Sequence, residues 1–595
     1  MTSVTGCTIE QFTATTGIPV SFLDSIGIKE VQRKQRRAVR LSEAATYLAP
    51  PSEDGLADDE VVERKGGGST LFGLDSLDLI GDTGSVYLVA DEIEALTLRL
   101  HGLPALAVPA AARWAEGWPA LDEAAVVFVV FSGAGSEPPA WVAEAPFRDR
   151  ARLLHLAMPR VANLLHRNTP SNFRAAWKSV CGTATSWSEY EATRRAERRA
   201  EAATRCADLV MAPDILSRVA TDLGRAGFAG STREAKLLYL VATSRLLERP
   251  ISTAVKGPSS AGKSFVVKSV LEFFPKSAFL TMTAMSPKAL VYSKEPLAHR
   301  VLVLYEADGM GSTAELILRS LLSEGHIVYD TVASEDGSAP EGKHIERDGP
   351  TSFITTTTRV ALHRENETRF FSVTVSDSAE HTHAILRALA DEAAHEVDYT
   401  RWHALQEFLA SGEHEVTIPF GMTLAGLVTG HAVRLRRDFG ALLSLVRTHA
   451  LLHQETRDRD DRNRIVATIA DYAAVYGLVH EMFAETAEEA VPADVRETVE
   501  AIQQMGPSAL ADGDGVTIRQ ITTKLASLGV ALDRSSVQRR VSTAIELGFL
   551  LDRTGGGRGK AKQIVLGDWP GYGDGAVLPT PAELEEVCAY ACTPA

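Results

Sequence analysis

The chain has 595 residues, of which 45% are hydrophobic and 23% charged, so it is long enough to form several globular domains. Its formal net charge of −16 excludes a protein that coats nucleic acid, and any DNA contact must come from local basic patches. Five scattered cysteines, no signal-like N-terminus and no apolar run longer than 124–131 lead us to expect a cytoplasmic protein with no disulfide framework and no membrane partner.

The first fifty residues predict a small helical module, 1–50, because Gly17 and Gly27 stand where two short helices would stop. The basic segment 29–41 is interpreted as a solvated charged face. Acidic residues, prolines and glycines over 51–69 indicate a linker.

An alternation of strands and helices begins after Gly84. Apolar strands are expected at 86–90, 104–109 and 124–131, with a helix over 91–102 between the first two. This order predicts a compact α/β domain with a parallel sheet over residues 70–165.

Residues 85–111 resemble the Toprim fold of primases. In that family a glutamate after the first strand is the acid/base, and a later D-x-D motif binds Mg²⁺. This sequence has Ala90 at the glutamate position and 131–133, Phe-Ser-Gly, where the two aspartates belong. Three neighbouring carboxylates are the alternative ligands: Asp91, Glu92 and Glu94. Because two-metal chemistry needs clustered carboxylates, we interpret this as a degenerate Toprim-like domain without primase activity.

Residues 166–212 predict a helical connector of mixed charge. Two more helices are expected over 214–247. They lead into the clearest motif of the chain, and such a lead-in is similar to that of ring ATPases.

The motif G-x-x-x-x-G-K-[ST] occupies residues 257–264. Its members are Gly257, Pro258, Ser259, Ser260, Ala261, Gly262, Lys263 and Ser264. A strand over 251–255 and a helix over 265–274 flank it, as a phosphate-binding loop requires. Lys263 is expected to reach the β- and γ-phosphates of ATP, and Ser264 to ligate Mg²⁺. A glycine-rich structural turn would not explain a lysine and a serine in register.

The strand expected at 301–304 ends in a second candidate site. Glu306 stands where a catalytic glutamate would polarise the attacking water, and Glu306 and Asp308 are candidate Mg²⁺ ligands. Tyr305 occupies the position of the usual Mg²⁺-associated aspartate, so the sequence predicts nucleotide binding more firmly than hydrolysis.

A long hairpin is expected over 327–350, with Lys343 and His344 near its tip. It is interpreted as a pore loop that grips DNA phosphates, the alternative being a plain surface hairpin.

Two later segments resemble AAA+ ATPases. The strand at 351–358 ends in threonines, and Thr357 matches the position that senses the γ-phosphate. The sequence around Arg369 resembles the element that holds an arginine finger, with Arg359 as the weaker alternative; either arginine could instead form a structural salt bridge. Residues 430–482 resemble the lid of minichromosome-maintenance (MCM) ATPases. The resemblance assigns Arg437 to the lid arginine that reaches the nucleotide, with Arg434 and Arg436 as rivals.

The stretch 512–568 predicts a winged helix. Between Gly515 and Gly567 nine basic residues stand against three acidic ones, a local balance of +6. The second helix is expected to present three side chains to DNA: Arg534, Gln538 and Arg539. The wing would contact phosphate through three more: Arg558, Lys560 and Lys562. A winged helix used for protein contacts is the alternative.

The expected fold class is therefore multidomain α/β. After the Toprim-like domain come an AAA+ core, a helical lid, the winged helix and a tail: 213–400, 401–505, 512–568 and 569–595. This order resembles primase–helicase-like replication ATPases of bacterial mobile elements and prophages. The resemblance implies a homo-oligomeric, hexameric ring that acts as an ATP-dependent DNA helicase or translocase. The alternative is a nucleotide-switched DNA-binding regulator or defence ATPase with slow hydrolysis.

Overall fold

The computed structural model divides into two compact units, 1–197 and 198–595, which are described separately. It describes residues 7–33, 36–41, 45–47, 62–64, 71–108, 121–133, 135–259, 261–283, 286, 288–306, 312–333, 341–358, 370–375, 379–390, 396–428, 435–489, 492–509, 514–554, 562–567 and 577–591. Within these ranges no helix is long and apolar enough to cross a bilayer.

The N-terminal segment contains strands as well as helices. Thr8 and Gln11 form a capping box that starts α1 (Ile9–Thr16), and α2 (Val20–Ser25) follows. The basic segment is then folded into strands of a four-stranded antiparallel sheet: β1 (Lys29–Arg33), β2 (Arg36–Arg40), β3 (Ala45–Tyr47) and β4 (Val62–Arg64). The expectation of a purely helical module over 1–50 was therefore wrong. Val39 and Tyr47 face the apolar cluster that includes Phe12, and this tertiary packing determines the strand conformation.

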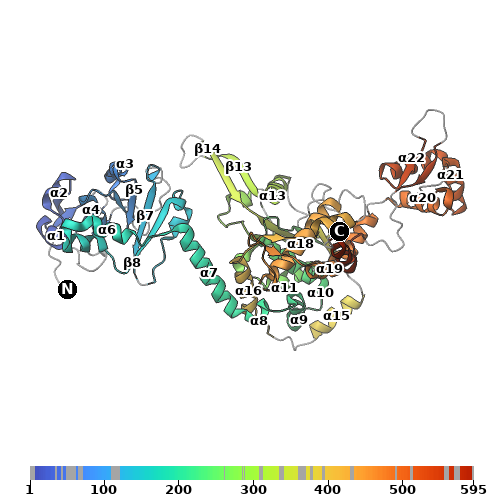
Figure 1. The fold of residues 1–595 in the computed structure, drawn as a ribbon, viewed down its shortest axis with the longest axis horizontal. Coiled ribbons are helices and arrows are strands. Elements are labelled where there is room, and N and C mark those ends of the chain that lie inside the picture. The colour runs from blue at the N-terminus through green and yellow to red at the C-terminus, as the bar shows by residue number, and fades with distance from the viewer. Residues whose placement is uncertain are drawn as a thin grey trace. The chain divides into compact units, whose positions relative to one another are not determined.

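A second sheet of the N-terminal unit contains β5, β7 and β8, which are labelled in Figure 1. Its strand order is β6-β5-β7-β8-β9. The first four strands are parallel and β9 is antiparallel to β8. Their bounds are β5 Ser85–Val89, β6 Ala105–Ala107, β7 Val126–Ser132, β8 Ala151–Leu156 and β9 Thr185–Ser186. Helices α4 (Glu92–Leu100), α5 (Val161–Asn168) and α6 (Phe173–Cys181) belong to the same unit. The predicted parallel α/β arrangement is confirmed.

Helices lead into the second unit as predicted. The charged helix α7 (Trp187–Arg205) runs across the boundary between the units, and α8 (Ala207–Val210), α9 (Ile215–Arg225) and α10 (Thr232–Thr243) follow. The buried side chains of α9 and α10 join the largest apolar cluster of the protein, which also contains the strand and helix around the phosphate-loop motif.

That cluster surrounds a five-stranded parallel sheet of order β11-β12-β15-β10-β16. The strands are β10 Thr253–Lys256, β11 Phe279–Met282, β12 Arg300–Leu304, β15 Thr351–Thr357 and β16 Phe371–Thr374. Helix α11 (Lys263–Leu271) follows β10, and α13 (Ser312–Glu324) follows β12. Since β15 lies between β10 and β12, its last residues lie beside the ends of both strands.

The predicted hairpin consists of β13 (His326–Ala333) and β14 (Glu341–Asp348), which extend from the sheet region in Figure 1. Its base is anchored by Ile327, which is buried in an apolar cluster with Leu318 and Phe353.

The region predicted as a helical lid is mostly helical, with a short parallel strand pair, β17 (Val416–Thr417) and β18 (Ile465–Val466). Its helices are α16 Thr400–Ala410, α17 Gly421–Leu427, α18 Leu435–Leu452 and α19 Ile469–Glu489, preceded by α15 Ala379–Ala390. The last predicted lid helix, α20 (Ala493–Gln503), packs elsewhere. Its apolar residues belong to the cluster of the C-terminal segment, so the lid ends before residue 493.

The C-terminal segment contains α20, α21 (Ile518–Ser527), α22 (Arg534–Glu546) and the hairpin β19 (Leu550–Asp552) and β20 (Ile564–Leu566). Val516 adds a bridge to Ile564. The tail then returns to the second unit's main cluster, where α23 (Pro581–Ala591) contacts α17 and α19. Tyr472 Oη donates a hydrogen bond to Pro579 O at 2.6 Å, so the segment 493–567 is an insertion within the packed body.

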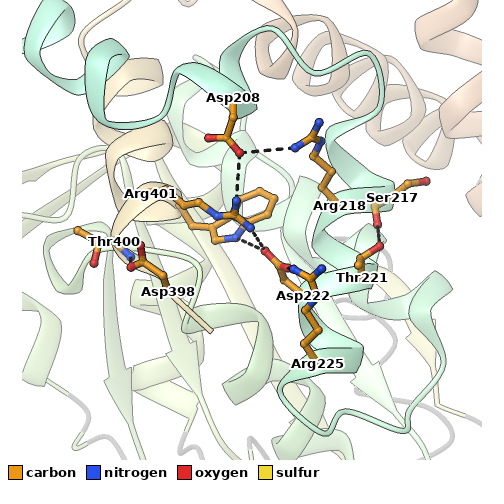
Figure 2. Close-up of polar contacts among 10 residues, drawn as sticks. Asp208, Ser217, Arg218, Thr221, Asp222, Arg225, Asp398, Thr400 and Arg401 are labelled. Atoms are coloured by element: carbon orange, nitrogen blue, oxygen red, sulfur yellow. Dashed lines mark hydrogen bonds and ion pairs between the residues drawn. The ribbon is translucent and has the colours of Figure 1, made fainter. Parts of the chain in front are cut away.

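An ion-pair network joins the start of the second unit to α16 (Figure 2). Asp222 is 2% exposed and accepts hydrogen bonds from Arg401 Nη2 at 2.5 Å and Trp402 Nε1 at 2.9 Å. Asp208 accepts from Arg401 at 3.0 Å and from Arg218 at 3.5 Å. These contacts join the lead-in helices to α16, which lies almost two hundred residues later in the chain. The helices before and after the parallel sheet therefore pack together.

Candidate functional site

The phosphate-loop motif lies between β10 and α11, as predicted. Gly257 has a φ of +154°, and a Cβ there would lie 3.0 Å from the carbonyl oxygen of Val375 on the neighbouring segment. Gly262 has a φ of +82° and is the N-cap of α11. Both glycines therefore allow backbone positions that a side chain would strain, and they direct the N-terminus of α11 toward the loop.

Lys263 is only 8% exposed, and its ammonium group is held by the loop itself. Nζ donates hydrogen bonds to the carbonyl oxygens of Gly257 at 3.0 Å and Pro258 at 2.6 Å. Carbonyl oxygens carry only partial charge, so a bound phosphate would be the stronger partner for this cation. Ser264 follows on the exposed side of the first turn of α11.

Glu306 is positioned by its backbone at the end of β12. Its φ of +61° is unusual for a residue with a side chain, and its N–H donates to Thr356 Oγ1 at 3.2 Å. Non-glycine residues in this region carry backbone strain, which is often stored at functional sites. The threonine of the adjacent strand thus fixes the turn that presents the Glu306 carboxylate.

Glu306 and the phosphate loop line one open pocket of about 550 Å³. Its lining residues are Ser259, Gly262, Lys263, Ser264, Phe265, Thr283, Glu306, Thr356, Thr357 and Thr358. The structure thus brings together the predicted lysine, hydroxyl, glutamate and Thr357, and the volume is in the range of small-ligand sites.

The residues present fit a Mg²⁺ ion that is held partly by its nucleotide. Ser264 and Glu306 supply one hydroxyl and one carboxylate to the same pocket, and Mg²⁺ is commonly bound through one or two protein oxygens together with substrate phosphates. Asp308 lies outside the described residues. Within the described part of the chain, no group of three or more His, Cys, Asp or Glu side chains lies close enough together to hold a metal ion.

Tyr305 contributes to the core and not to the metal site. Its side chain is half-buried against the main apolar cluster, and burial raises the pKa of its phenol. Its N–H donates to Met282 O at 3.0 Å, so the backbone continues the sheet at this residue. A neutral phenol therefore occupies the position at which a Mg²⁺-associated aspartate was expected.

A second pocket, of about 260 Å³, adjoins the first and was missed by sequence reasoning. Ala261, Gly262 and Phe265 line it, and the last two also line the larger pocket. The rings of Phe228 and Phe265 stack with centroids 5.9 Å apart and 12° between their planes. A Cβ on Gly230 would lie 2.3 Å from the Phe228 ring. The sequence signal was a phenylalanine enclosed by Gly227 and Gly230 just before α10, which local patterns assigned to a helix break.

The predicted arginines of the nucleotide site cannot be placed. Arg359, Arg369 and Arg434 lie outside the described residues. Arg436 and Arg437 lie in the first turn of α18, but their side chains are outside the described part as well.

The carboxylates of the N-terminal unit form a closed internal network. Asp91 caps α4 by accepting from Glu94 N–H at 2.9 Å, and it accepts from Arg160 Nε at 2.7 Å. Both Glu94 oxygens accept from Ala162 N–H at 3.2 Å. Burial, and then the nearby Asp91, raises the pKa of Glu94 to about 8. Asp91 is therefore paired internally with Arg160, and the cavity beside this pair is only about 10 Å³.

The candidate DNA contacts differ in their surroundings. His344 Nδ1 lies 2.6 Å from Asp330 Oδ1, and Lys343, the third residue of β14, pairs with Thr331 of β13. The three predicted contacts on α22 are all exposed: Arg534, Gln538 and Arg539. Lys562 lies 3.8 Å from Asp552, whereas Arg558 and Lys560 lie outside the described residues.

A parallel sheet with a phosphate loop after one strand and a glutamate after another defines a P-loop domain that binds nucleotide. Consistent with this, a family model described as the MTBMA_p00010 P-loop domain matches residues 207–407. No curated protein matches the chain. The matched range begins in the lead-in helices and ends in α16, the same elements that the Asp208 and Asp222 network joins.

Proposed function

We propose that this protein is a DNA-dependent ATPase of the AAA+ type that acts as a helicase or translocase. The observation that carries the ATPase proposal is the shared pocket of Lys263, Ser264, Glu306 and Thr357. The position of β15 between the phosphate-loop strand and the Glu306 strand supports the AAA+ assignment, because Thr357, the proposed γ-phosphate sensor, is at the end of this middle strand.

In the proposed reaction the loop N–H groups and Lys263 bind the phosphates of ATP and stabilise the charge that develops on them. Ser264 and Glu306 would hold Mg²⁺, which would neutralise negative charge on the phosphates. Glu306 orients the water that attacks the γ-phosphorus, and Thr357 contacts the γ-phosphate. Arg369 from a neighbouring subunit and Arg437 of the lid are proposed to complete the site in a ring of six subunits.

DNA binding is proposed for the C-terminal segment as a winged helix. Its three helices and terminal hairpin have the required order, and α22 exposes Arg534, Gln538 and Arg539 on a locally basic segment of a chain with net charge −16. The wing would add Arg558, Lys560 and Lys562. The hairpin β13–β14 is the weaker candidate, because residues 326–348 contain six acidic side chains and only two basic ones, excluding histidine.

A second candidate is a nucleotide-switched DNA-binding regulator that hydrolyses ATP slowly. Tyr305 favours it, because a half-buried, neutral phenol cannot replace the carboxylate that would help to hold Mg²⁺. Under either proposal the N-terminal unit retains a Toprim-like scaffold without primase chemistry, in line with Ala90 and with the pairing of Asp91 to Arg160.

Steady-state ATP turnover of the full chain, with and without single-stranded DNA, separates the two proposals. Lys263→Ala provides the blank, and Lys268→Ala, an exposed lysine on the same helix, is the matched control. DNA stimulation that is lost only in Lys263→Ala supports the motor and justifies strand-displacement assays. Lys263-dependent ATP binding with negligible turnover under both conditions would reject the motor in favour of the regulator.

A further inference from the structure

We propose that the β1–β2 ribbon of the N-terminal unit binds the phosphate backbone of a nucleic acid. The ribbon consists of Lys29–Arg33 and Arg36–Arg40, which pair as antiparallel strands. This binding surface goes beyond the proposed function, which assigns DNA contacts only to the second unit, and it requires neither ATP nor α22.

The ribbon concentrates positive charge more strongly than the C-terminal segment does. Its two strands contain five basic side chains and one acidic one, a net charge of +4 in ten residues, whereas residues 515–567 carry +6 in 53. Each strand is about 17 Å long at roughly 3.4 Å per residue, so the ribbon carries about one net positive charge per 4 Å.

This linear charge density favours a nucleic acid over an acidic protein as the partner. One strand of DNA carries about one phosphate per 3.4 Å, close to the spacing of net charge along the ribbon. Carboxylates on a folded protein surface have no such regular repeat. A nucleic acid can therefore neutralise the whole ribbon, and not one side chain at a time.

Cations of the two strands lie opposite one another. The register sets Lys29 opposite Arg40 and Arg33 opposite Arg36. The side chains of Lys29 and Arg40 are exposed, and neither forms an ion pair with another described residue. Like charges directly opposite each other destabilise a strand pair. A polyanion bound to this surface would remove that repulsion.

A single carboxylate within the ribbon offsets its five cations. Glu30 Oε1 lies 3.4 Å from Arg37 Nη1, and Glu30 Oε2 accepts a hydrogen bond from the N–H of Ile9 at 3.1 Å. The Arg37 side chain is still 69% exposed. Glu30 thus connects the ribbon to the start of α1 and leaves Arg37 accessible to a ligand.

Protection of a sheet edge does not explain these residues. Charged side chains on an edge strand prevent pairing with another chain, and β1 is an edge strand of its sheet. However, three of the five cations belong to β2, which pairs with β1 on one side and with β3 on the other. A strand with neighbours on both sides does not need this protection.

The test is fluorescence anisotropy of the full chain with a labelled single strand and a labelled duplex of about 20 nucleotides, without ATP and at several salt concentrations. Lys29→Gln/Arg40→Gln should weaken duplex binding roughly 10-fold and reduce the slope of log K against log salt by about 2. Lys29→Arg/Arg40→Lys keeps both charges and should bind like wild type. Arg195→Gln/Arg198→Gln, which removes two exposed arginines of α7, is the matched control and should change neither quantity.

Urea denaturation of the same variants separates a lost contact from a folding defect. Because Lys29 and Arg40 lie opposite each other, Lys29→Gln/Arg40→Gln should unfold at the same urea concentration as wild type or at a higher one. Weaker DNA binding by a variant at least as stable as wild type supports the proposal. A lower unfolding midpoint would contradict the repulsion on which the proposal depends.

A combination with Arg534→Ala/Arg539→Ala distinguishes this proposal from the DNA contacts proposed for α22. Unchanged affinity and slope in Lys29→Gln/Arg40→Gln overturn the ribbon and leave α22 to be judged by its own variant. Binding lost only in Lys29→Gln/Arg40→Gln supports the ribbon and rejects α22. Lys263-dependent ATP binding tests the nucleotide site independently of both. Poly-L-glutamate of matched charge that competes as well as DNA would overturn the nucleic acid in favour of an acidic protein partner.

Discussion

Two sites of this protein lie at the carboxyl ends of parallel strands, and they differ in how their charges are satisfied. After β5, the Asp91 carboxylate is paired with Arg160, and both side chains are less than 5% exposed. After β12, Glu306 is exposed to a pocket of about 550 Å³, and the ammonium group of Lys263 donates hydrogen bonds to two loop carbonyl oxygens. In the first site the charged groups are paired with each other, whereas in the second the charged groups of Lys263 and Glu306 line an open pocket.

The difference shows why a count of carboxylates is a poor guide to chemistry. In the N-terminal unit the Asp91 carboxylate is paired with an internal arginine, and the Glu94 carboxyl accepts from the amide of Ala162. Buried pairs of this kind are structural, because removal of one partner leaves a charge in a medium of low polarity. In the P-loop domain the same edge of the sheet keeps open volume beside its charges.

The largest effect is expected for Arg160→Met, which removes the ionic partner of Asp91. If Arg160 serves only to neutralise Asp91, its loss should lower the free energy of unfolding of the N-terminal unit by about 3 to 5 kcal/mol. Urea denaturation, with hydrogen exchange of α4 to locate the effect, measures this change.

The matched control is Arg99→Met. Arg99 pairs with Asp75, which is 61% exposed, so this variant should lose about 1 kcal/mol or less. A stability loss for Arg160→Met no larger than that of the control would show that the Asp91 site is not a structural ion pair.

Glu306→Gln tests the open site. The amide keeps the shape of the side chain but cannot orient water as a base, so kcat should fall roughly 10²- to 10³-fold while ATP affinity changes only a few-fold. Turnover and equilibrium binding measured on the same preparation separate these effects. Glu295→Gln, a partner of Arg300 outside the pocket, should leave both unchanged, and full turnover in Glu306→Gln would remove this residue from the mechanism.

Local sequence patterns predicted the open site far better than the closed one. The phosphate loop, the strand before Glu306 and the strand ending in Thr357 each have a local signature, and the sheet order then brings them together. Arg160 comes 69 residues after Asp91, on a turn with a φ of +58°, and no periodicity indicates that it folds back.

Packing between residues distant in sequence also explains the other differences between the predicted and the observed elements. Packing against distant residues decided that the basic N-terminal segment forms strands, that α20 leaves the lid and that α23 returns to it. Phe228 was also missed, because it becomes a neighbour of the phosphate loop only through the packing of α10 on α11. Local sequence patterns predicted the motifs, but not the contacts between residues that only tertiary packing brings together.

Glu94→Gln tests the closed site of the N-terminal unit through the pH dependence of its stability. The pKa of Glu94 is raised to about 8 from an ordinary value of 4.5, so the folded state keeps a proton that the unfolded state releases. Stability of the N-terminal unit should therefore fall as pH rises from about 4.5 to about 8 and level off above. Glu94→Gln should flatten this slope and be more stable than wild type at pH 8, by about 1 to 3 kcal/mol.

Unfolding by urea across this pH range is the measurement, with Asp75→Asn as the control for an exposed carboxylate. A slope that persists in Glu94→Gln would assign the proton to another group.

The contrast between paired and unpaired charge recurs on α22 and gives the smallest expected effect. Arg540 donates to Glu497 Oε2 at 2.7 Å and fastens α22 to α20, whereas Arg534 and Arg539 are exposed and have no ionic partner in the described part of the chain. Arg534→Ala and Arg539→Ala should each weaken DNA binding by about 1 kcal/mol, and each should reduce the slope of log K against log salt by about 1 if the arginine contacts phosphate. Fluorescence anisotropy at several salt concentrations measures both, with Arg195→Ala on α7 as the control. An unchanged slope in both variants would mean that the exposed face of α22 binds something other than DNA, and that an unpaired charge alone does not define a nucleic-acid site.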